Sequence, residues 1–553
     1  MGKPITNITI VGGGTAGWIT AFYLIHRYKR RKEIIGRDVS ITLIESPDVA
    51  IIGVGEATVP TLKGTLREGG ISEAEFFARA DATFKLGIWF KGWNRKKNGA
   101  PIGFLHPFTG GLSVDGMNPG YSFKKHGLSA RPEFDDQDFV RVISHAREAM
   151  ERMCGPRALN DPEYSGALQY AYHLDAAKFS EFLAEVCVAR GVAHVRDNVE
   201  HVRLDERGFI SSLQLRERGD WPVELVVDCT GFKALLISGA LKEPFESFSD
   251  YLLNDRAIPI QIKHRDPARL EPVTTSTALE AGWSWNIPLR SRIGAGYVFC
   301  SAFKSDDDAK KEFLDHLGPV AQGMDPHVIK MRVGRMRRSW VKNCVAVGLA
   351  SGFLEPLEST AIMTIELQAR WLLNVMPSTD FEEPLIREYN SLCESLYGEV
   401  RDFLGIHFTQ NNRDDTPFWR ACRHDAKKSD SLRAQLDLWK CMLPGPLDLR
   451  DKRVFSNWSV LCLLMGKDFY KNPPVGVLEV VSSLKWQKYC HEVWRRKQAV
   501  LDGIADHRAL VESIAGSSVA GRSLRDAYDP AAAPKLGLGI LTVDPQPIMS
   551  QLN

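Results

Sequence analysis

The sequence lacks the features that would place it in a specialised class of proteins. Its 553 residues have a net charge of only +2, so no global field for nucleic acid or a membrane surface is implied. None of the ten cysteines forms a C-x-x-C pair, which favours reduced core thiols over disulfides or a metal site. No apolar run reaches membrane-spanning length, no internal repeat is found, and the first strand begins too early to leave room for a signal peptide. We therefore expect a cytoplasmic protein that binds no metal, nucleic acid or membrane.

What the sequence does contain is an ordinary globular composition, with 44% hydrophobic and 25% charged residues, and a glycine motif near its start. The apolar run Ile8–Val11 predicts a buried strand, and Gly12–Gly17 follows at once and fits G-x-G-x-x-G. A helix is predicted from Trp18 to Ile25, then a strand from Val39 to Ile44 that ends in Glu45. The glycines let a pyrophosphate approach the backbone and the helix N-terminus, while the acid can accept hydrogen bonds from a ribose. This order of elements predicts a dinucleotide-binding site.

Three later segments predict a pocket beside this unit. Residues Ile51–Pro60 hold two glycines, an acid and a terminal proline, which predicts a loop close to a flat or charged group. A helix is expected from Glu73 to Phe84, directly before Lys85. The stretch from Arg95 to Pro132 is rich in glycine, proline and polar residues, and we expect it to form loops over a pocket that His106 could line.

The last motifs combine aromatic residues with a helix start. Thr277–Val298 predicts a sheet in which Trp283 and Trp285 share one face, because alternate strand residues point the same way. A helix is predicted from Ala361 to Leu373, so the preceding Glu358-Ser359-Thr360 lies near a helix N-terminus, where backbone N–H groups bind anions. Taken alone, these residues would be core tryptophans and a first-turn acid.

Together these motifs resemble those of the flavin-dependent halogenases of the tryptophan-halogenase type, and they occur in that family's order. The matching segments, from the N-terminus on, are Gly12–Gly17, Gly53–Pro60, Ala82–Gly87, Trp283–Pro288 and Phe353–Thr360, with a weaker likeness over Arg401–His407 and Pro417–Trp419. The resemblance implies an α/β fold: an FAD-binding, glutathione-reductase-like dinucleotide domain with a β-sheet insertion and a largely helical C-terminal substrate-binding part. It predicts an FAD-binding module over 1–370 with substrate-side sheet and loops at about 95–160 and 240–330, a helical substrate-binding region over 371–500, and a C-terminal tail over 501–553.

The activity that the resemblance implies is an oxidoreductase reaction of secondary metabolism on an aromatic substrate. Reduced FAD and O2 would convert chloride or bromide into hypohalous acid, which reaches Lys85 in a separate pocket. Lys85 would hold it by a hydrogen bond or as a haloamine, and Glu358 would support the halogen transfer. A desolvated lysine and a carboxylate that can accept a proton suit these roles chemically. A separate flavin reductase is expected to supply FADH2, because no strong NAD(P)H site is found in the sequence.

The candidate site residues fall into four groups. The catalytic pair is Lys85 and Glu358. The cofactor-binding residues are Gly12, Gly14, Thr15, Ala16, Gly17, Glu45, Gly55, Glu56, Ala57, Thr58 and Gly348. The halide-binding residues are Ser359, Thr360 and Ala361. The substrate-pocket residues are His106, Trp283, Trp285, Phe455 and Trp458.

Two departures from the tryptophan-specific pattern bear on halide and substrate. Position 361 is Ala where those members have Gly, which adds a methyl group beside the halide amides. Val454–Leu461 offers aromatic residues but little charge to hold an amino-acid head group, which argues against free tryptophan. We therefore expect an indole, phenol, pyrrole or larger aromatic substrate, free or tethered to a carrier. Regiochemistry, halide preference and a homodimeric state stay open, as do two alternatives: an FAD-dependent aromatic monooxygenase and a catalytically inactive flavin-binding protein.

Overall fold

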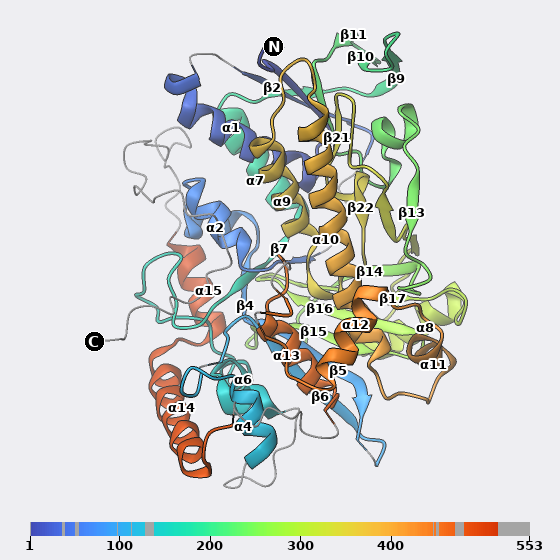
Figure 1. Ribbon diagram of the computed structural model, residues 1–553. Helices are drawn as coiled ribbons and strands as arrows, with labels where there is room; N and C mark the ends of the chain where they lie inside the picture. The colour runs from blue at the N-terminus through green and yellow to red at the C-terminus, as the bar shows by residue number, and fades with distance from the viewer. Residues whose placement is uncertain are drawn as a thin grey trace.

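The computed structural model describes residues 2–35, 39–49, 55–96, 98–111, 113–127, 138–445, 447–449, 453–470 and 480–517. This part of the chain folds into several sheets with helices packed against them and a helical C-terminal part (Figure 1). Residues 51–54 of the predicted glycine loop, and residues 97, 112 and 128–132 of the predicted pocket loops, lie outside the described residues.

A six-stranded sheet forms the core of the dinucleotide-binding unit. Its strands run in the order β20-β21-β12-β1-β2-β8. Their bounds are Trp340–Val341, Cys344–Ala346, Leu225–Asp228, Asn7–Val11, Ser40–Glu45 and Ala193–Arg196. Neighbouring strands are parallel except β20 and β21, and the central strands are buried apolar runs, as a covered parallel sheet requires.

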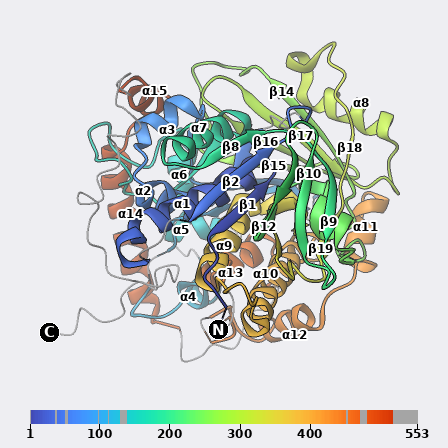
Figure 2. The same cartoon turned by 90° about the horizontal axis from the view of Figure 1, so that it is seen from above.

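Helix α1 (Thr15–Ile35) starts at the glycine turn and connects β1 to β2. It packs against α7 (Ala176–Ala189) and α9 (Ala361–Asn374), which come from much later in the chain (Figures 1 and 2). The predicted order of strand, turn, helix and strand is confirmed, although the helix extends well beyond the predicted Ile25.

A seven-stranded sheet forms the second layer. Its order is β18-β14-β17-β16-β15-β5-β6. The bounds are Ile329–Lys330, Arg256–Ile262, Ile293–Phe299, Gly282–Pro288, Thr274–Ala278, Gly87–Arg95 and Pro101–Pro107. Strands β5 and β15 pair in parallel. Residues 87–107 therefore complete the sheet that is otherwise formed by strands between residues 256 and 330. The sheet predicted around the two tryptophans is confirmed.

The prediction of loops from Arg95 to Pro132 is wrong in two places. Residues Pro101–Pro107 form strand β6, although their glycine and prolines suggested a loop. They do so because they pair antiparallel with the neighbouring strand β5. Residues Pro119–His126 form helix α4, which the Asn118 side chain caps by accepting the Gly120 N–H.

A three-stranded sheet, β3-β7-β4, contains Lys85 as the last residue of β4. The bounds are Gly55–Ala57, Ala171–Asp175 and Thr83–Lys85. The helix predicted up to Phe84 ends at Arg79, as α3 (Glu73–Arg79), because Asp81 adopts a φ of 54° and the next residues pair with β7. The described end of the predicted glycine loop is likewise a strand, paired with β7. Backbone pairing with a distant strand outweighs the local pattern in both cases.

The C-terminal part is helical, as predicted. Its helices are α10 (Glu383–Thr409), α11 (Pro417–His424), α12 (Asp430–Trp439), α13 (Asn457–Gly466), α14 (Ser483–Gly503) and α15 (His507–Gly516). The prediction of a loose tail from residue 501 is wrong for α15, which packs against α3 and buries His507, Leu510 and Val511.

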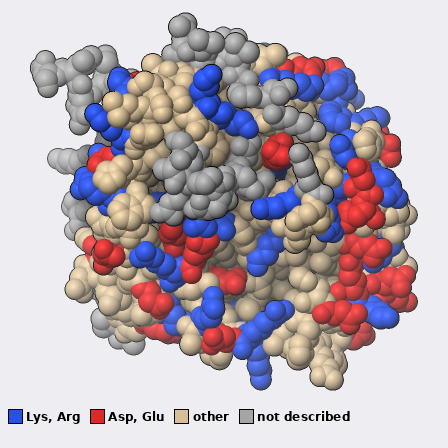
Figure 3. Space-filling view, turned by 90° about the horizontal axis from the view of Figure 1, so that it is seen from below, with Lys and Arg blue, Asp and Glu red and all other residues tan. Residues whose placement is uncertain are grey.

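The surface and the cysteines agree with the balanced composition. Lys, Arg, Asp and Glu side chains are mixed over the face shown in Figure 3. All ten cysteines are free thiols, eight of them buried. Among the described residues, no helix is both long and apolar enough to cross a membrane.

Candidate functional site

Lys85 lies at the centre of the candidate site, at the end of strand β4. Its side chain is fully buried, and its Nζ donates to the Thr58 carbonyl at 2.9 Å and to Ser359 Oγ at 2.8 Å. The centroid of the Phe108 ring lies 5.2 Å from the same nitrogen. Three segments that are far apart in the sequence therefore meet at this amine, and one of them contributes Ser359, the residue next to Glu358.

Burial lowers the pKa of the Lys85 ammonium to about 7, and the negative charge of Glu358 opposes only part of that shift. Near neutral pH the side chain is therefore present both as ammonium and as free amine. A neutral amine has two N–H groups, and the two acceptors use both of them. Its lone pair is then free to act as a nucleophile.

Glu358 ends the short 3-10 turn η6 (Pro356–Glu358) and is buried. His106 Nδ1 donates to its Oε2 at 3.0 Å, and His407 Nε2 donates to its Oε1 at 2.6 Å. Burial alone would raise the pKa of this carboxyl, but the two histidines outweigh it and lower the pKa to about 2. Glu358 is therefore ionised, and an ionised carboxylate can only accept, which assigns the donor nitrogen of each histidine.

His407 is a site residue that the sequence analysis placed only in the weaker family likeness. It lies in α10 with no exposed surface, and its ring is stacked on Phe90 at 4.7 Å between centroids. Burial lowers its pKa to about 4 although Glu358 pulls the other way, so the imidazole is neutral at neutral pH. Its Nδ1 has no partner among the described residues. No local spacing could pair it with Glu358, 49 residues earlier.

Trp283 and Trp285 lie on one face of β16, with ring centroids 6.2 Å apart, as predicted. The Trp283 Nε1–H donates to Glu355 Oε2 at 3.0 Å, and burial raises the pKa of that carboxyl to about 7. The Trp285 ring lies directly on Gly296, where an added Cβ would come within 2.0 Å of the ring. Both indoles are therefore held in fixed positions on this face of the sheet.

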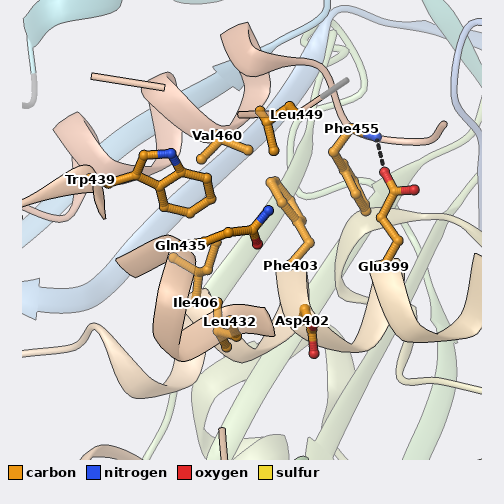
Figure 4. Close-up of a pocket in the computed structure, with 10 residues that line it drawn as sticks. All are labelled: Glu399, Asp402, Phe403, Ile406, Leu432, Gln435, Trp439, Leu449, Phe455 and Val460. Atoms are coloured by element: carbon orange, nitrogen blue, oxygen red, sulfur yellow. Dashed lines mark hydrogen bonds between the residues drawn. The ribbon is translucent and has the colours of Figure 1, made fainter. Parts of the chain in front are cut away.

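Phe455 contacts the site through another ring. It is stacked on Phe403 with 3.6 Å between centroids and 8° between planes, and Phe403 lies 5.9 Å from His106 (Figure 4). The Glu399 carboxylate accepts the Phe455 N–H at 2.9 Å and so fixes the turn before α13. A cavity of about 20 Å³ borders this stack. It is lined by Glu399, Asp402, Phe403, Ile406, Leu432, Gln435, Trp439, Leu449, Phe455 and Val460.

Trp458 lies beside the loop that follows Phe108. An added Cβ on Gly110 would come within 3.7 Å of its indole, and the Phe139 ring lies 5.9 Å from it. Its Nε1 is buried and has no partner among the described residues. Of the predicted substrate-pocket residues, His106 therefore contacts Glu358, Phe455 approaches it through Phe403, and Trp458 lies beside Gly110. Trp283 and Trp285 contact Glu355 and Gly296 instead.

The predicted halide residues lie where the sequence places them, at the start of α9. Ser359 adopts a φ of 60°, an uncommon conformation for a residue other than glycine, and its hydroxyl is used by Lys85. Thr360 is the N-cap but its side chain caps no N–H group, and Ala361 is the first helical residue. Their role in halide binding stays a prediction.

The glycine turn has the shape that a dinucleotide requires. Gly12 has a φ of 119°, and an added Cβ would lie 2.2 Å from the Cys229 carbonyl oxygen. A Cβ on Gly17 would lie 1.9 Å from the Gly12 oxygen, so only glycine lets the helix approach the strand here. At Gly14 a Cβ would meet nothing within 4 Å, which leaves open space beside the backbone. These residues fit an FAD pyrophosphate.

Four further predicted cofactor residues, Glu45, Gly348, Ala16 and Thr15, lie at or close to this turn. The Glu45 carboxylate lies beside Gly13 and accepts a hydrogen bond from His194 Nε2 at 2.7 Å, so a ribose would share it. Gly348 approaches Ala16 so closely that an added Cβ would lie 2.8 Å from that methyl group. The Thr15 hydroxyl is engaged by Ser180 at 3.2 Å.

The remaining predicted cofactor residues belong to β3 and its end. Gly55 and Ala57 pair with β7, and burial raises the pKa of the Glu56 carboxyl between them to about 7. Thr58 exchanges two hydrogen bonds with the Tyr172 backbone through its hydroxyl, both at 2.9 Å. The Thr58 side chain thus holds the strand while its carbonyl holds Lys85, and cofactor contacts of these residues stay predictions.

Comparisons with known proteins agree with this geometry. The family model described as tryptophan halogenase matches residues 7–481. The tryptophan 6-halogenase of Streptomyces toxytricini is 39% identical over 455 residues, which cover 79% of this chain and 84% of that protein. The tryptophan 7-halogenase of Lentzea aerocolonigenes is 37% identical over 506 residues, with 86% and 92% covered. The crystal structure of a tryptophan halogenase from Shewanella frigidimarina superimposes with a TM-score of 0.85 at 33% identity, over 93% of this chain and 98% of that one.

Proposed function

The chain belongs to the tryptophan halogenase family, and from this premise we propose that Lys85 and Glu358 together transfer the halogen to the substrate. The protein is a flavin-dependent halogenase, an oxidoreductase that uses FADH2 and O2 to replace an aromatic C–H bond with a carbon–halogen bond. The observation that supports the proposal is the meeting of a buried amine and a buried, ionised carboxylate on either side of Ser359.

The glycine turn and Glu45 would hold FAD, which supplies, in its reduced form and with O2, the oxidising power that converts a halide into hypohalous acid. Chloride or bromide would bind at the backbone N–H groups of residues 359–361, at the start of α9. The methyl group of Ala361 would narrow that site relative to a glycine and so bias it between the two ions.

Lys85 would receive the halogen as a free amine. Its lone pair attacks the halogen of HOX, the O–X bond breaks, and the amine becomes a haloamine with release of water. The aromatic carbon then takes the halogen from nitrogen, which restores the amine after proton transfer. Burial favours this route over a purely hydrogen-bonded HOX, because it lowers the pKa of Lys85 towards neutrality and so populates the free amine.

Glu358 would stabilise the positive charge of the arenium intermediate and accept the proton that leaves the aromatic carbon. It is ready for both roles because His106 and His407 keep it ionised in a buried site. The net reaction is Ar–H + HOX → Ar–X + H2O, which balances without a further oxidant.

The substrate would be an aromatic compound held among the rings near Phe108 and Trp458, with Trp283 and Trp285 between it and the flavin. Phe455 and Phe403 would border the pocket on the side of α10. The described segment 454–461 has no charged side chain for an amino-acid head group, so an indole, phenol or pyrrole without one is favoured over free tryptophan.

The test of this proposal is Lys85→Met, which removes the amine and keeps a chain of similar length. With FADH2, O2 and bromide, we expect the aryl bromide measured by mass spectrometry to fall at least ~100-fold. Consumption of FADH2 should continue, and free hypohalous acid, trapped by a halogenation-sensitive dye, should increase.

The matched control is Lys467→Met, because Lys467 is also buried and its pKa is also lowered to about 7 by burial, but it contacts Asn94 and Trp93 instead of Ser359. It should keep most of the halogenation. Product that gains one oxygen independently of halide would instead identify a monooxygenase, and full halogenation by Lys85→Met would overturn the role of Lys85.

A further inference from the structure

The last described helix, α15, contacts the strand that holds Lys85 (Figure 1). His507, its first residue, has no exposed surface. Its Nε2 accepts the backbone N–H of Phe84 at 3.1 Å, and its Nδ1 donates to the Leu270 carbonyl at 2.8 Å. One imidazole thus joins a residue 423 positions earlier to one 237 positions earlier.

Only a neutral imidazole with its proton on Nδ1 can make both bonds, because Nε2 must accept while Nδ1 donates. Burial lowers the pKa of His507 to about 4, so this form is present throughout the neutral range. The bond to Phe84 matters because β4 is an edge strand of its sheet. The Phe84 N–H is engaged by His507, while the strand itself pairs with β7 on its other edge.

The residue on the other side of Lys85 is anchored to the same segment. The Leu86 N–H donates to the Pro272 carbonyl at 2.7 Å, and the Leu86 carbonyl accepts the Phe108 N–H at 3.0 Å. The backbone on both sides of Lys85 is therefore connected to residues 270–272, directly at Leu86 and through His507 at Phe84. The side chain between them has to reach two acceptors at 2.9 and 2.8 Å.

We propose that His507 is a positioning residue for halogen transfer, which fixes the backbone of β4 so that the Lys85 amine lies between Thr58 and Ser359. The inference rests on the proposed function of Lys85. It assigns a role in the reaction to a helix that lies outside the segment matched by the family model, residues 7–481.

Three substitutions at His507 separate its two hydrogen bonds. A glutamine amide extends about as far as Nε2, so His507→Gln keeps an acceptor for Phe84. An asparagine amide extends about as far as Nδ1, so His507→Asn keeps only the donor to Leu270. His507→Leu removes both. Val511→Ala is the matched control, because it loosens the packing of the same buried helix and leaves both His507 hydrogen bonds in place.

Two quantities are measured: the aryl halide formed per FADH2 consumed, and the free hypohalous acid trapped by a dye. Their ratio is the partition of the oxidant between product and escape. His507→Asn and His507→Leu should lower the aryl halide per FADH2 ~10-fold, because a displaced amine misses the halogen, while FADH2 consumption stays at the unmodified rate. His507→Gln and Val511→Ala should keep the partition of the unmodified enzyme. Lost stability alone does not change this ratio.

Two results would overturn the inference: an unchanged partition in His507→Leu, or the same loss in Val511→Ala as in His507→Asn. Lys85→Met is measured in the same series. If its partition equals that of the unmodified enzyme, the proposed function of Lys85 fails; if only the His507 variants leave the partition unchanged, the positioning role alone fails.

Discussion

At the scale of single residues, the site is built from ionisable groups whose pKa values are all lowered, but for different physical reasons. Desolvation lowers the pKa of Lys85, whereas two histidines hold the carboxylate of Glu358 ionised against the same desolvation. An amine and a carboxylate in one low-dielectric site would otherwise form a plain ion pair. Here Ser359 accepts the hydrogen bond of the amine, and the histidines donate to the carboxylate. The amine can therefore lose its proton while the carboxylate stays ionised.

The first prediction at this scale concerns the pH dependence of halogen transfer. If the free amine of Lys85 reacts, transfer should rise with pH through about 7 and level off above it. One pH unit below that pKa, ~10% of the amine is free, so transfer should be ~10-fold slower. The measurement is aryl halide per FADH2 from pH 5.5 to 9. A fall with rising pH would show that the ammonium holds HOX by a hydrogen bond instead.

The second prediction concerns Lys467, whose buried ammonium donates to Asn94 Oδ1 at 3.2 Å and which lies over the Trp93 ring. Its folded-state pKa of about 7 lies below the ordinary lysine value of 10.5, so between these pH values the unfolded chain binds more protons and stability rises with pH. Below about pH 7 the penalty is complete. Lys467→Met should therefore stabilise the protein at pH 6.5 on the order of 3 kcal/mol, after ~1 kcal/mol for the lost hydrogen bond.

Urea unfolding at pH 6.5 and at pH 10 measures this effect. The midpoint of Lys467→Met should exceed that of the unmodified protein at the lower pH and approach it at the higher pH. A variant that is less stable at both would show that the cation–π contact and the hydrogen bond outweigh desolvation.

At the scale of elements, short strands and turns place the reactive groups. Strand β4 has three residues, η6 has three, and the glycine turn connects β1 to α1. None of them is stable alone, and each depends on partners from other parts of the chain: β7 for β4, α10 for Glu358, and Cys229 for Gly12.

The prediction at this scale tests the glycine turn position by position. Gly14→Ala should leave the melting temperature of the FAD-free protein unchanged, because the added methyl group meets no atom within 4 Å. It should weaken FAD binding ~10-fold, because the methyl group occupies the space where the pyrophosphate approaches. Fluorescence titration of FAD and thermal unfolding of the FAD-free variant measure the two effects.

Two other glycine substitutions serve as controls, one for the stability of the fold and one for FAD binding. Gly17→Ala should destabilise the FAD-free protein, since its methyl group would lie 1.9 Å from the Gly12 oxygen. Gly64→Ala, in helix α2 (Thr61–Glu68) with open space around it, should stabilise by ~0.5 kcal/mol and leave FAD binding alone. Unchanged FAD affinity in Gly14→Ala would place the cofactor elsewhere.

At the scale of the whole molecule, the three-stranded sheet that holds Lys85 contacts the seven-stranded sheet, and α10 of the helical C-terminal part brings His407 to Glu358. Strands β5 and β6 connect the two large units because they follow β4 directly and pair with the insertion. This arrangement puts the glycine turn and the Lys85 amine on different elements, so under the proposed mechanism the oxidant would move between them. The amount of free hypohalous acid released is therefore the quantity that should increase when the Lys85 site is altered.

The prediction at this scale concerns the source of electrons. FAD with NADH or NADPH alone should give no aryl halide. The sequence contains one G-x-G-x-x-G motif, Gly12–Gly17, and FAD would occupy it, so no second motif is left for a nicotinamide dinucleotide. Photochemically reduced FAD, added in aerobic pulses without any reductase, should give product. Steady turnover with NADH alone would contradict the need for a separate flavin reductase.

The sequence alone determined the dinucleotide unit, the tryptophan pair on one strand face, the helix after Thr360 and the family likeness, because periodicity and glycine spacing are local signals. It did not determine that Thr83–Lys85 forms a strand, that Pro101–Pro107 pairs with Gly87–Arg95, or that His507–Gly516 is a packed helix. These depend on hydrogen bonds and burial supplied by other elements: β7 for Thr83–Lys85, β5 for Pro101–Pro107, and α3, from the other end of the chain, for His507–Gly516. The same holds for His407 and His507: their residue types are visible in the sequence, but only the folded chain brings one to Glu358 and the other to the backbone beside Lys85.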